Sequence, residues 1–214
     1  MKYWKVTKKE QDNPMLEHSK LEISETYWHN NAINYLLTNY LDDNQKRTCI
    51  DVGASYGWFT VPFSNIFNEV KSFEPRKDVY SCFLENTSHL NNVQSWNIGC
   101  GNDNTKVYFS ADKVSGWSHV SKTPTKKRIQ LKTIDSLNFK NVDFIKIDVE
   151  GFEYDVLQGA KNTILQYKPL IMVEVHCKRD HASFNNRQNI FNFFKNINYE
   201  FLDLRGSDFI FKST

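Results

Sequence analysis

An α/β fold with a mostly parallel β-sheet is predicted by three observations. Short apolar segments alternate with amphipathic stretches between residues 48 and 176, which is typical of a parallel sheet with helices on both faces. Acidic residues and glycines follow several of these segments, where the loops of such a sheet begin. The last two apolar segments, 199–204 and 208–212, are separated by only three residues, and so short a turn requires an antiparallel pair.

The spacing of apolar residues along the chain predicts the individual helices and strands. Residues 1–24 are polar and irregular, whereas 25–41 place Trp28, Ala32 and Tyr35 near one face, as an amphipathic helix does. The remaining pattern gives strands at 48–52, 70–74, 93–98, 142–148 and 169–176, and helices at about 57–68, 77–90, 152–167 and 186–196. We therefore expect an N-terminal segment, 1–47, whose helix packs over the active site, and a main domain at 48–214.

Two stretches depart from a simple alternation. Residues 99–141 are too long for a bare loop, and segments 107–110 and 128–133 resemble short strands, so we expect a hairpin-like insertion there. Pro62 lies inside the helix predicted at 57–68, where it would lose a hydrogen bond and crowd the carbonyl of Trp58. Either this helix is kinked, or it begins near Val61.

Composition narrows the possible partners. The 214 residues carry a formal net charge of +2, which favours neither nucleic acid nor a membrane surface. The densest basic run, 122–128, is interpreted as a solvated loop. The four cysteines show no metal-binding spacing, the N-terminus lacks the apolar core of a signal peptide, and no run of about 18 apolar residues is present. A cytoplasmic location without membrane contact is expected.

The most informative stretch follows the first predicted strand. Asp51 lies at its end, and Gly53, Ala54 and Gly57 belong to a tight turn into a helix. A backbone without Cβ atoms lets a ligand approach closely, and the helix offers free N–H groups. The spacing D-x-G-x-x-x-G differs from G-x-G-x-x-G, and its carboxylate would repel a pyrophosphate. The turn favours a cationic, amino-acid-bearing nucleoside, S-adenosylmethionine; an ordinary turn with incidental glycines is the alternative.

Polar residues also end the second and third predicted strands. Glu74 stands where an acidic side chain can accept both hydroxyls of a ribose. Asn97 follows the third strand and either hydrogen-bonds a purine edge or satisfies loop backbone groups. With Asp51, Glu74 completes the predicted cofactor site.

Further titratable residues end the fourth and fifth strands. Asp148 and Glu150 lie two apart, as do Glu174 and His176, so each pair shares a face if its strand continues. Asp148, Glu150 and His176 are the candidate catalytic residues, with Asp148 or His176 removing a proton from an acceptor hydroxyl. Alternatively, Asp148, Glu150, Glu174 and His176 hold a divalent cation. The structural alternatives are a helix N-terminus for Glu150 and Glu153, and a backbone hydrogen bond for His176.

These segments together resemble the FkbM family of S-adenosylmethionine-dependent methyltransferases. The resemblance covers residue 48 to about 212, and its most specific part is the block from Ile147 to Ala160. Its segments are CIDVGASYGWFT, VKSFEP, WNIGCGN, LKTIDSL, FIKIDVEGFEYDVLQGA and PLIMVEVH. The resemblance implies the class I, Rossmann-like methyltransferase fold, in which a seven-stranded, mostly parallel sheet ends in an antiparallel C-terminal strand pair.

The same resemblance implies a chemistry. It implies O-methylation of a hydroxyl, often on a sugar or a polyketide-like product, and of these we expect a sugar. It maps cofactor contacts onto Asp51, Gly53, Gly57, Glu74 and Asn97. It places Asp148 and Glu150 at the reaction edge. The expected partner is therefore a small-molecule or glycan acceptor; the sequence does not indicate an oligomeric state.

Three alternatives to this function remain. A nucleic-acid methyltransferase is disfavoured because the D/N-P-P-Y block is absent and the charge is too even for a long anionic substrate. A dehydrogenase is disfavoured by the missing G-x-G-x-x-G motif. A non-catalytic S-adenosylmethionine-binding partner of a larger assembly would not need the acidic residues at the strand ends.

Overall fold

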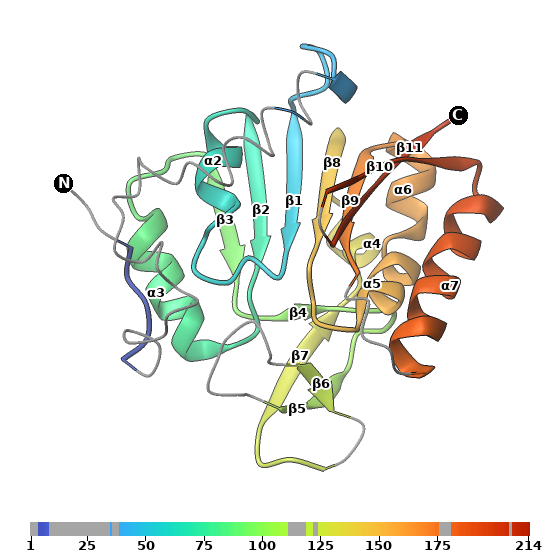
Figure 1. Ribbon diagram of the computed structural model, residues 1–214. Helices are drawn as coiled ribbons and strands as arrows, with labels where there is room; N and C mark the ends of the chain where they lie inside the picture. Colours follow the sequence, from blue (N-terminus) through green and yellow to red (C-terminus); the bar gives the residue numbers. More distant parts are fainter. Residues whose placement is uncertain are drawn as a thin grey trace.

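The main sheet has seven strands. The computed structural model describes residues 4–8, 35, 39–110, 119–121, 124–175, 181–205 and 207–214. The strand order is β10, β11, β9, β8, β1, β2, β3 (Figure 1). The strands span β1 (Thr48–Val52), β2 (Glu69–Phe73), β3 (Val93–Trp96), β8 (Val142–Ile147), β9 (Leu170–Glu174), β10 (Tyr199–Arg205) and β11 (Asp208–Ser213). The pairs formed by β1, β2, β3, β8 and β9 are parallel, and β11 is antiparallel to both β9 and β10, which confirms the predicted sheet.

Helices cover this sheet on both faces. They are α2 (Thr60–Ser64), α3 (Lys77–Thr87), α4 (Ile134–Leu137), α5 (Glu153–Gly159), α6 (Lys161–Tyr167) and α7 (His181–Asn196). Alternate residues of the strands face α4 to α7, and the residues between them face α2. Ile50 and Val52, for example, belong to the apolar cluster that packs under α4 to α7. Cys49 belongs to the apolar cluster on the opposite face, with Phe63 of α2 and with Phe67. Figure 1 shows α3 and α7 at opposite ends of the molecule.

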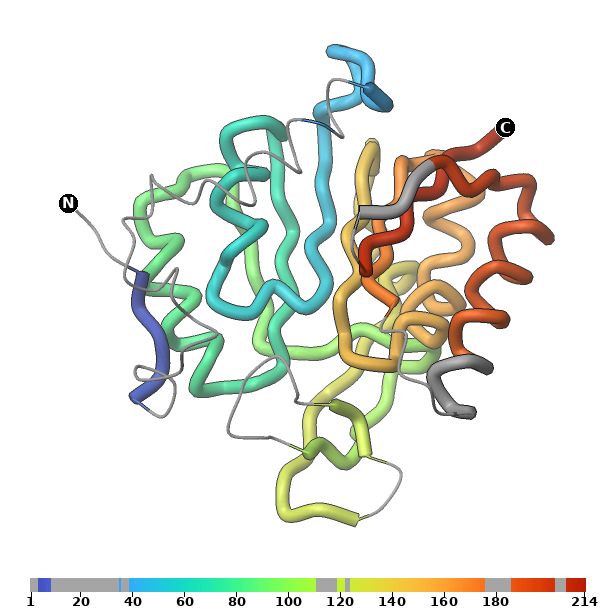
Figure 2. Tube along the Cα trace, in the orientation of Figure 1, coloured from blue at the N-terminus to red at the C-terminus, as the bar shows by residue number. Residues whose placement is uncertain are grey.

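A second sheet forms the insertion. It contains β4 (Gly99–Cys100), β5 (Lys106–Ser110), β6 (His119–Ser121) and β7 (Arg128–Lys132), in the order β4, β7, β5, β6. The expected antiparallel pair is present as β5 and β7, but the insertion is a four-stranded sheet rather than a hairpin. Figures 1 and 2 show it beyond the end of the main sheet toward which β1 and β2 run. The strand predicted at 93–98 is correspondingly shorter, because the chain leaves the main sheet after Trp96.

The helix predicted at about 57–68 begins later in the structure than the hydrophobic pattern indicated. Residues 53–59 form a turn, and α2 starts at Thr60, which agrees with a helix start near Val61 rather than with a kink. Pro62 is therefore the third helical residue. Its neighbours Val61 and Phe63 donate to the carbonyls of Gly57 and Phe59 at 3.0 and 2.9 Å, so the missing N–H of Pro62 removes only the intervening hydrogen bond to Trp58. The predicted helix at 25–41 lies largely outside the described residues.

The helix predicted at 152–167 is interrupted. Ala160 leaves helical geometry at φ −110° and ψ 1°, and it separates α5 from α6. The interruption follows Gly159, where a Cβ atom would lie 1.9 Å from the carbonyl oxygen of Gly101. Close backbone contact between α5 and the start of the insertion therefore accompanies the break. Within the described residues, no helix combines the length and the hydropathy needed to cross a membrane.

Candidate active site

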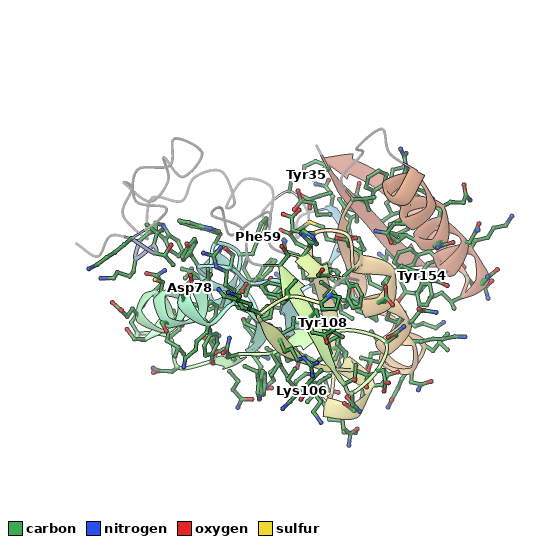
Figure 3. All side chains as sticks on the ribbon, turned by 90° about the horizontal axis from the view of Figure 1, so that it is seen from below. Tyr35, Phe59, Asp78, Lys106, Tyr108 and Tyr154 are labelled. Carbon is green, nitrogen blue, oxygen red and sulfur yellow. The ribbon has the colours of Figure 1, made fainter. Side chains whose placement is uncertain are left out.

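The candidate site lies at the carboxyl ends of the parallel strands. The strand order reverses between β1 and β8, which are neighbours in the sheet although β2 follows β1 in the chain. Ligands of open α/β sheets bind in the crevice outside such a reversal. Figure 3 looks onto this edge, with Asp78 of α3 and Tyr154 of α5 on opposite sides and Phe59 and Tyr108 between them.

The turn after β1 packs tightly against the end of β8. Gly53 has φ +85°, and a Cβ atom there would lie 1.7 Å from the carbonyl oxygen of Asp148. The N–H groups of Gly53 and Ala54 both donate to the carbonyl of Phe73, at 3.0 and 2.9 Å. Gly57 also has positive φ, +96°. Glycine is thus required at position 53 because the segment that follows β8 lies too close for a side chain. The sequence spacing did not reveal this reason.

Asp51 lies wholly buried beneath this turn. Its Oδ2 accepts a hydrogen bond of 2.6 Å from the Thr60 hydroxyl, which also contacts Ser72. Its Oδ1 is buried without a hydrogen-bond partner among the described residues. Burial raises the pKa of Asp51, while Lys146 and the Thr60 hydrogen bond oppose that shift. Because an unsatisfied buried oxygen is costly, this atom suits a donor from a ligand.

Glu74 joins the ends of β1 and β2. Its Oε2 accepts from the Ser55 N–H at 3.0 Å, and its Oε1 accepts from the Arg76 N–H at 2.7 Å. A carboxylate offers about four acceptor positions, so capacity remains for ligand hydroxyls. The Nδ2 of Asn97 donates to the Glu74 carbonyl at 2.8 Å. Asn97 therefore supports the backbone here, as its structural alternative predicted, and its placement beside Glu74 does not test a cofactor contact.

A buried lysine, which sequence reasoning missed, lies at the centre of the site. The Lys146 side chain is 1% exposed, and its Nζ donates to Asp148 Oδ2 at 2.9 Å. The same Nζ lies 4.3 Å from the centre of the Phe59 ring. Burial alone would lower the pKa of Lys146, but the surrounding carboxylates outweigh it and raise that pKa; they are Asp148, Asp208, Asp51 and Glu174. Lys146 is therefore the cation that balances this acidic cluster.

Of the two predicted catalytic acids, Asp148 lies at the end of β8 and Glu150 lies in the turn that follows. The Asp148 side chain is 25% exposed and follows directly after β8. Glu150 does not continue the strand as the pairing argument required, because β8 ends at Ile147 and Glu150 turns the chain at φ +55°. Asp148 thus remains the acid best placed at the strand end.

Glu174 belongs to the same cluster through β9. Burial, followed by the neighbouring Asp148, raises its pKa to about 8, while Lys146 and the Ser207 hydroxyl oppose the shift. The Ser207 hydroxyl donates to Glu174 at 2.7 Å. His176 lies outside the described residues. Within those residues, no three His, Cys, Asp or Glu side chains form a group that could hold a metal ion.

Glu153 has the structural role that its helix position predicted. It begins α5, accepts from the Gly151 N–H at 2.8 Å and accepts from the Asn186 side chain of α7 at 2.6 Å. Burial raises the pKa of Glu153, and these hydrogen bonds oppose that effect. It therefore stabilises the start of α5 and its packing on α7.

Solved structures with the same fold include a methyltransferase and a protein that binds S-adenosyl-L-methionine. The methyltransferase FkbM from Methylobacillus flagellatus KT superposes with a TM-score of 0.59 at 19% identity, covering 78% of this chain and 44% of that one. Fibrillarin from Aeropyrum pernix, in complex with natively bound S-adenosyl-L-methionine, gives a TM-score of 0.52 at 11% identity, covering 87% and 74%. The strand order of the main sheet is thus that of the methyltransferase fold.

The family follows from the sequence comparison. The methyltransferase FkbM domain matches residues 51–201, and this chain belongs to that family. Hexuronic acid methyltransferase AglP from Haloferax volcanii is 28% identical over 137 residues, which cover 61% of this chain. The aligned part spans only 56% of that relative.

Proposed function

We propose that this protein is an S-adenosylmethionine-dependent O-methyltransferase that acts on a hydroxyl of a sugar or glycan. One observation carries the proposal: a buried acid beneath the β1 turn, a second acid at the end of β2 and a lysine-held carboxylate at the end of β8 lie along one sheet edge. Membership of a methyltransferase family supports the reaction type. The activity of the relative AglP supports a sugar acceptor.

The residues present fit this cofactor. The unpartnered Oδ1 of Asp51 provides an acceptor for an ammonium group, and the spare acceptor positions of Glu74 suit ribose hydroxyls. When bound, S-adenosylmethionine would supply an electrophilic methyl group on a sulfonium. Asp148 would accept the proton of the acceptor hydroxyl, or orient that hydroxyl, while Lys146 holds its carboxylate in place.

Cofactor binding provides the direct test. Calorimetry should show one site for S-adenosylhomocysteine with micromolar-range affinity, about −8 kcal/mol. Glu74→Ala should weaken it by roughly 1–3 kcal/mol, because the ribose hydroxyls lose a charged acceptor. Asp78→Ala is the matched control, since that side chain lies nearby but pairs with Arg76. Tight NADH binding without any response to S-adenosylhomocysteine would exclude the proposal.

The binding of this ligand should also depend on pH. Burial raises the pKa of Glu74 from 4.5 to about 7. The ionised carboxylate is the stronger acceptor, so affinity should rise between pH 6 and pH 8, and binding below pH 7 should release a proton. Glu74→Gln, which cannot ionise, should flatten this profile in calorimetry. A profile that is already flat in the unmodified protein would show that Glu74 does not contact the ligand.

Metal dependence is a separate prediction. If Asp148 and Glu174, with Glu150 and His176, hold a divalent cation, EDTA should abolish methyl transfer and Mg²⁺ or Mn²⁺ should restore it. The measurement is transfer of a labelled methyl group to a glycan acceptor. Full activity after exhaustive chelation would leave proton removal by a side chain as the remaining account.

A further inference from the structure

A groove lies between α7 and the two shorter helices beside it. α5 packs against α7, and Figure 1 shows α5, α6 and α7 together on one side of the main sheet. The groove has a volume of about 410 Å³, which lies within the range of small-molecule sites. None of its lining residues belongs to the acidic cluster around Lys146. The polar residues that line this amide groove are Tyr154, Gln158, Lys161, Asn189, Asn192 and Asn196.

Carboxamides dominate the polar lining of the amide groove. Gln158 extends from α5, while the three asparagines recur along α7 at spacings of three and four, which places them on one face of that helix. Gln188 donates to Asn192 at 3.1 Å. Within the part of the chain that the structure describes, the side chains of Gln158, Asn189 and Asn196 form no hydrogen bond to the protein. These three amides are therefore available to a ligand.

The asparagines are costly for the helix that carries them. Five of the 16 residues of α7 are Asn, against 23 of 214 in the whole chain. Asn has a lower helix propensity than Ala, Lys, Glu or Gln, because its short side chain competes for backbone hydrogen bonds. Solvent exposure alone would be met equally well by Lys, Glu or Gln. A ligand for the amides accounts for a choice of residue that helix stability does not favour.

Packing fixes the walls of the amide groove. Phe193 and Ile197 form its apolar part, and the Phe193 ring is buried against Tyr154, with the ring centres 6.5 Å apart and the planes at 87°. The side chain of Asn186 donates to Glu153 at 2.6 Å and so ties α7 to the start of α5. The amides are thus mounted on helices that are held together before any ligand binds.

The chemistry of the lining indicates a neutral ligand that is rich in hydroxyl groups. A carboxamide both donates and accepts hydrogen bonds, as a hydroxyl group does. Among the described residues that line the groove, Lys161 is the one cation and none is acidic, so neither an anion nor a cation is matched by several opposite charges. The apolar surface is limited to the rings and Ile197, which suits the partly apolar face of a sugar ring.

We propose that the amide groove binds a neutral sugar unit of a glycan, at a site separate from that of methyl transfer. The inference goes beyond the proposed function, because it requires neither the cofactor nor Asp148. The volume favours a sugar over a protein partner, since a stable protein interface buries roughly 800 Å² on each partner. A groove of this size accommodates a small molecule or a short part of a chain.

The test observes the amides directly. Two-dimensional nuclear magnetic resonance of the ¹⁵N-labelled full chain resolves the side-chain NH₂ groups of Asn and Gln. The probes are maltotriose, cellotriose, mannotriose and triacetylchitotriose, which are neutral, and the peptide trialanine. At least one trisaccharide should shift the NH₂ signals of Gln158, Asn189 and Asn196, with a Kd of about 1 mM or lower. The shifts should persist in about 1 M salt, because no ion pair holds the ligand.

Two variants separate ligand binding from a structural role. Asn189→Ala and Asn196→Ala should each weaken trisaccharide binding by about fivefold, because each removes hydrogen bonds to the sugar. Neither should lower the midpoint of urea unfolding, since Ala is the better helix former. Asn162→Ala is the matched control: Asn162 is exposed on α6 but does not line the groove, so sugar binding should be unchanged.

Three outcomes would overturn the inference. They are the absence of NH₂ shifts with every trisaccharide, undiminished sugar binding in both groove variants, and equally strong shifts with trialanine, which would show that the groove accepts a peptide backbone. Failure to bind S-adenosylhomocysteine would instead remove the proposed function and leave the amide groove as a sugar site.

Discussion

Asp148→Asn should reduce methyl transfer by about 100-fold or more while cofactor affinity barely changes. Asparagine keeps the shape and hydrogen-bonding capacity of aspartate but removes the negative charge. The partly exposed carboxylate at the end of β8 is the group that would act on the acceptor hydroxyl, either as a base or as a metal ligand. The measurements are single-turnover transfer of a labelled methyl group and calorimetry with S-adenosylhomocysteine.

The same substitution at the other end of β8 provides the control. Asp143 is buried and accepts hydrogen bonds from Arg47, with an Nε–Oδ2 distance of 2.9 Å. Asp143→Asn should lower stability without a specific loss of turnover. If Asp148→Asn folds normally and keeps near-normal turnover on the true acceptor, the end of β8 is not the reaction centre. His176→Gln provides the comparison with the alternative base, and a larger loss in that variant would assign proton removal to His176.

Lys146→Met should lower both stability and turnover. Removal of the buried cation leaves several carboxylates without compensation, and breaking a buried ion pair of this kind typically costs about 3–5 kcal/mol. Turnover should fall because Asp148 loses the hydrogen bond that holds its carboxylate. Urea denaturation measures the free energy of unfolding, and the transfer assay measures turnover.

Lys71→Met is the matched control for this variant. Lys71 is also nearly buried, but its partner Glu69 is 57% exposed and can be solvated by water when the lysine is lost. Its stability loss should therefore be clearly smaller. In the Asp148→Asn background, Lys146→Met should have a reduced effect on turnover, because the two residues act as a unit. Equal stability losses for the two lysine variants would show that the acidic cluster does not depend on Lys146.

The fold was accessible from the sequence because its signals are local. Apolar segments, a glycine turn and a three-residue connection predicted the parallel strands and the antiparallel end of the sheet. The boundaries that failed depend on contacts between distant segments. Ala160 interrupts the predicted helix where neighbouring Gly159 meets the backbone of Gly101, and no pattern within residues 152–167 reveals that contact.

The candidate site was predicted less completely than the fold. Asp51, Glu74 and Asp148 stand at strand ends, and the structure places all three along one edge. Lys146 was missed because its importance arises from acids on three other strands. The available signal was a lysine between Ile145 and Ile147 in an otherwise apolar strand, since a charge is buried there only when it is paired.

The alternation of charge and apolar side chains across β1 and β8 also bears on how the chain assembles. Asp51 stands opposite Lys146 in the parallel ladder, while Ile50 and Val52 face the other side of the sheet with Ile145 and Ile147. A slip of one residue would exchange the two faces. It would bury the ammonium group of Lys146 in the apolar cluster beneath α5 to α7, where aromatic rings offer it no counter-ion. Registers of β1 and β8 that are shifted by one residue therefore cost free energy, because they bury an unpaired charge. This cost favours the native register during folding, independently of any ligand.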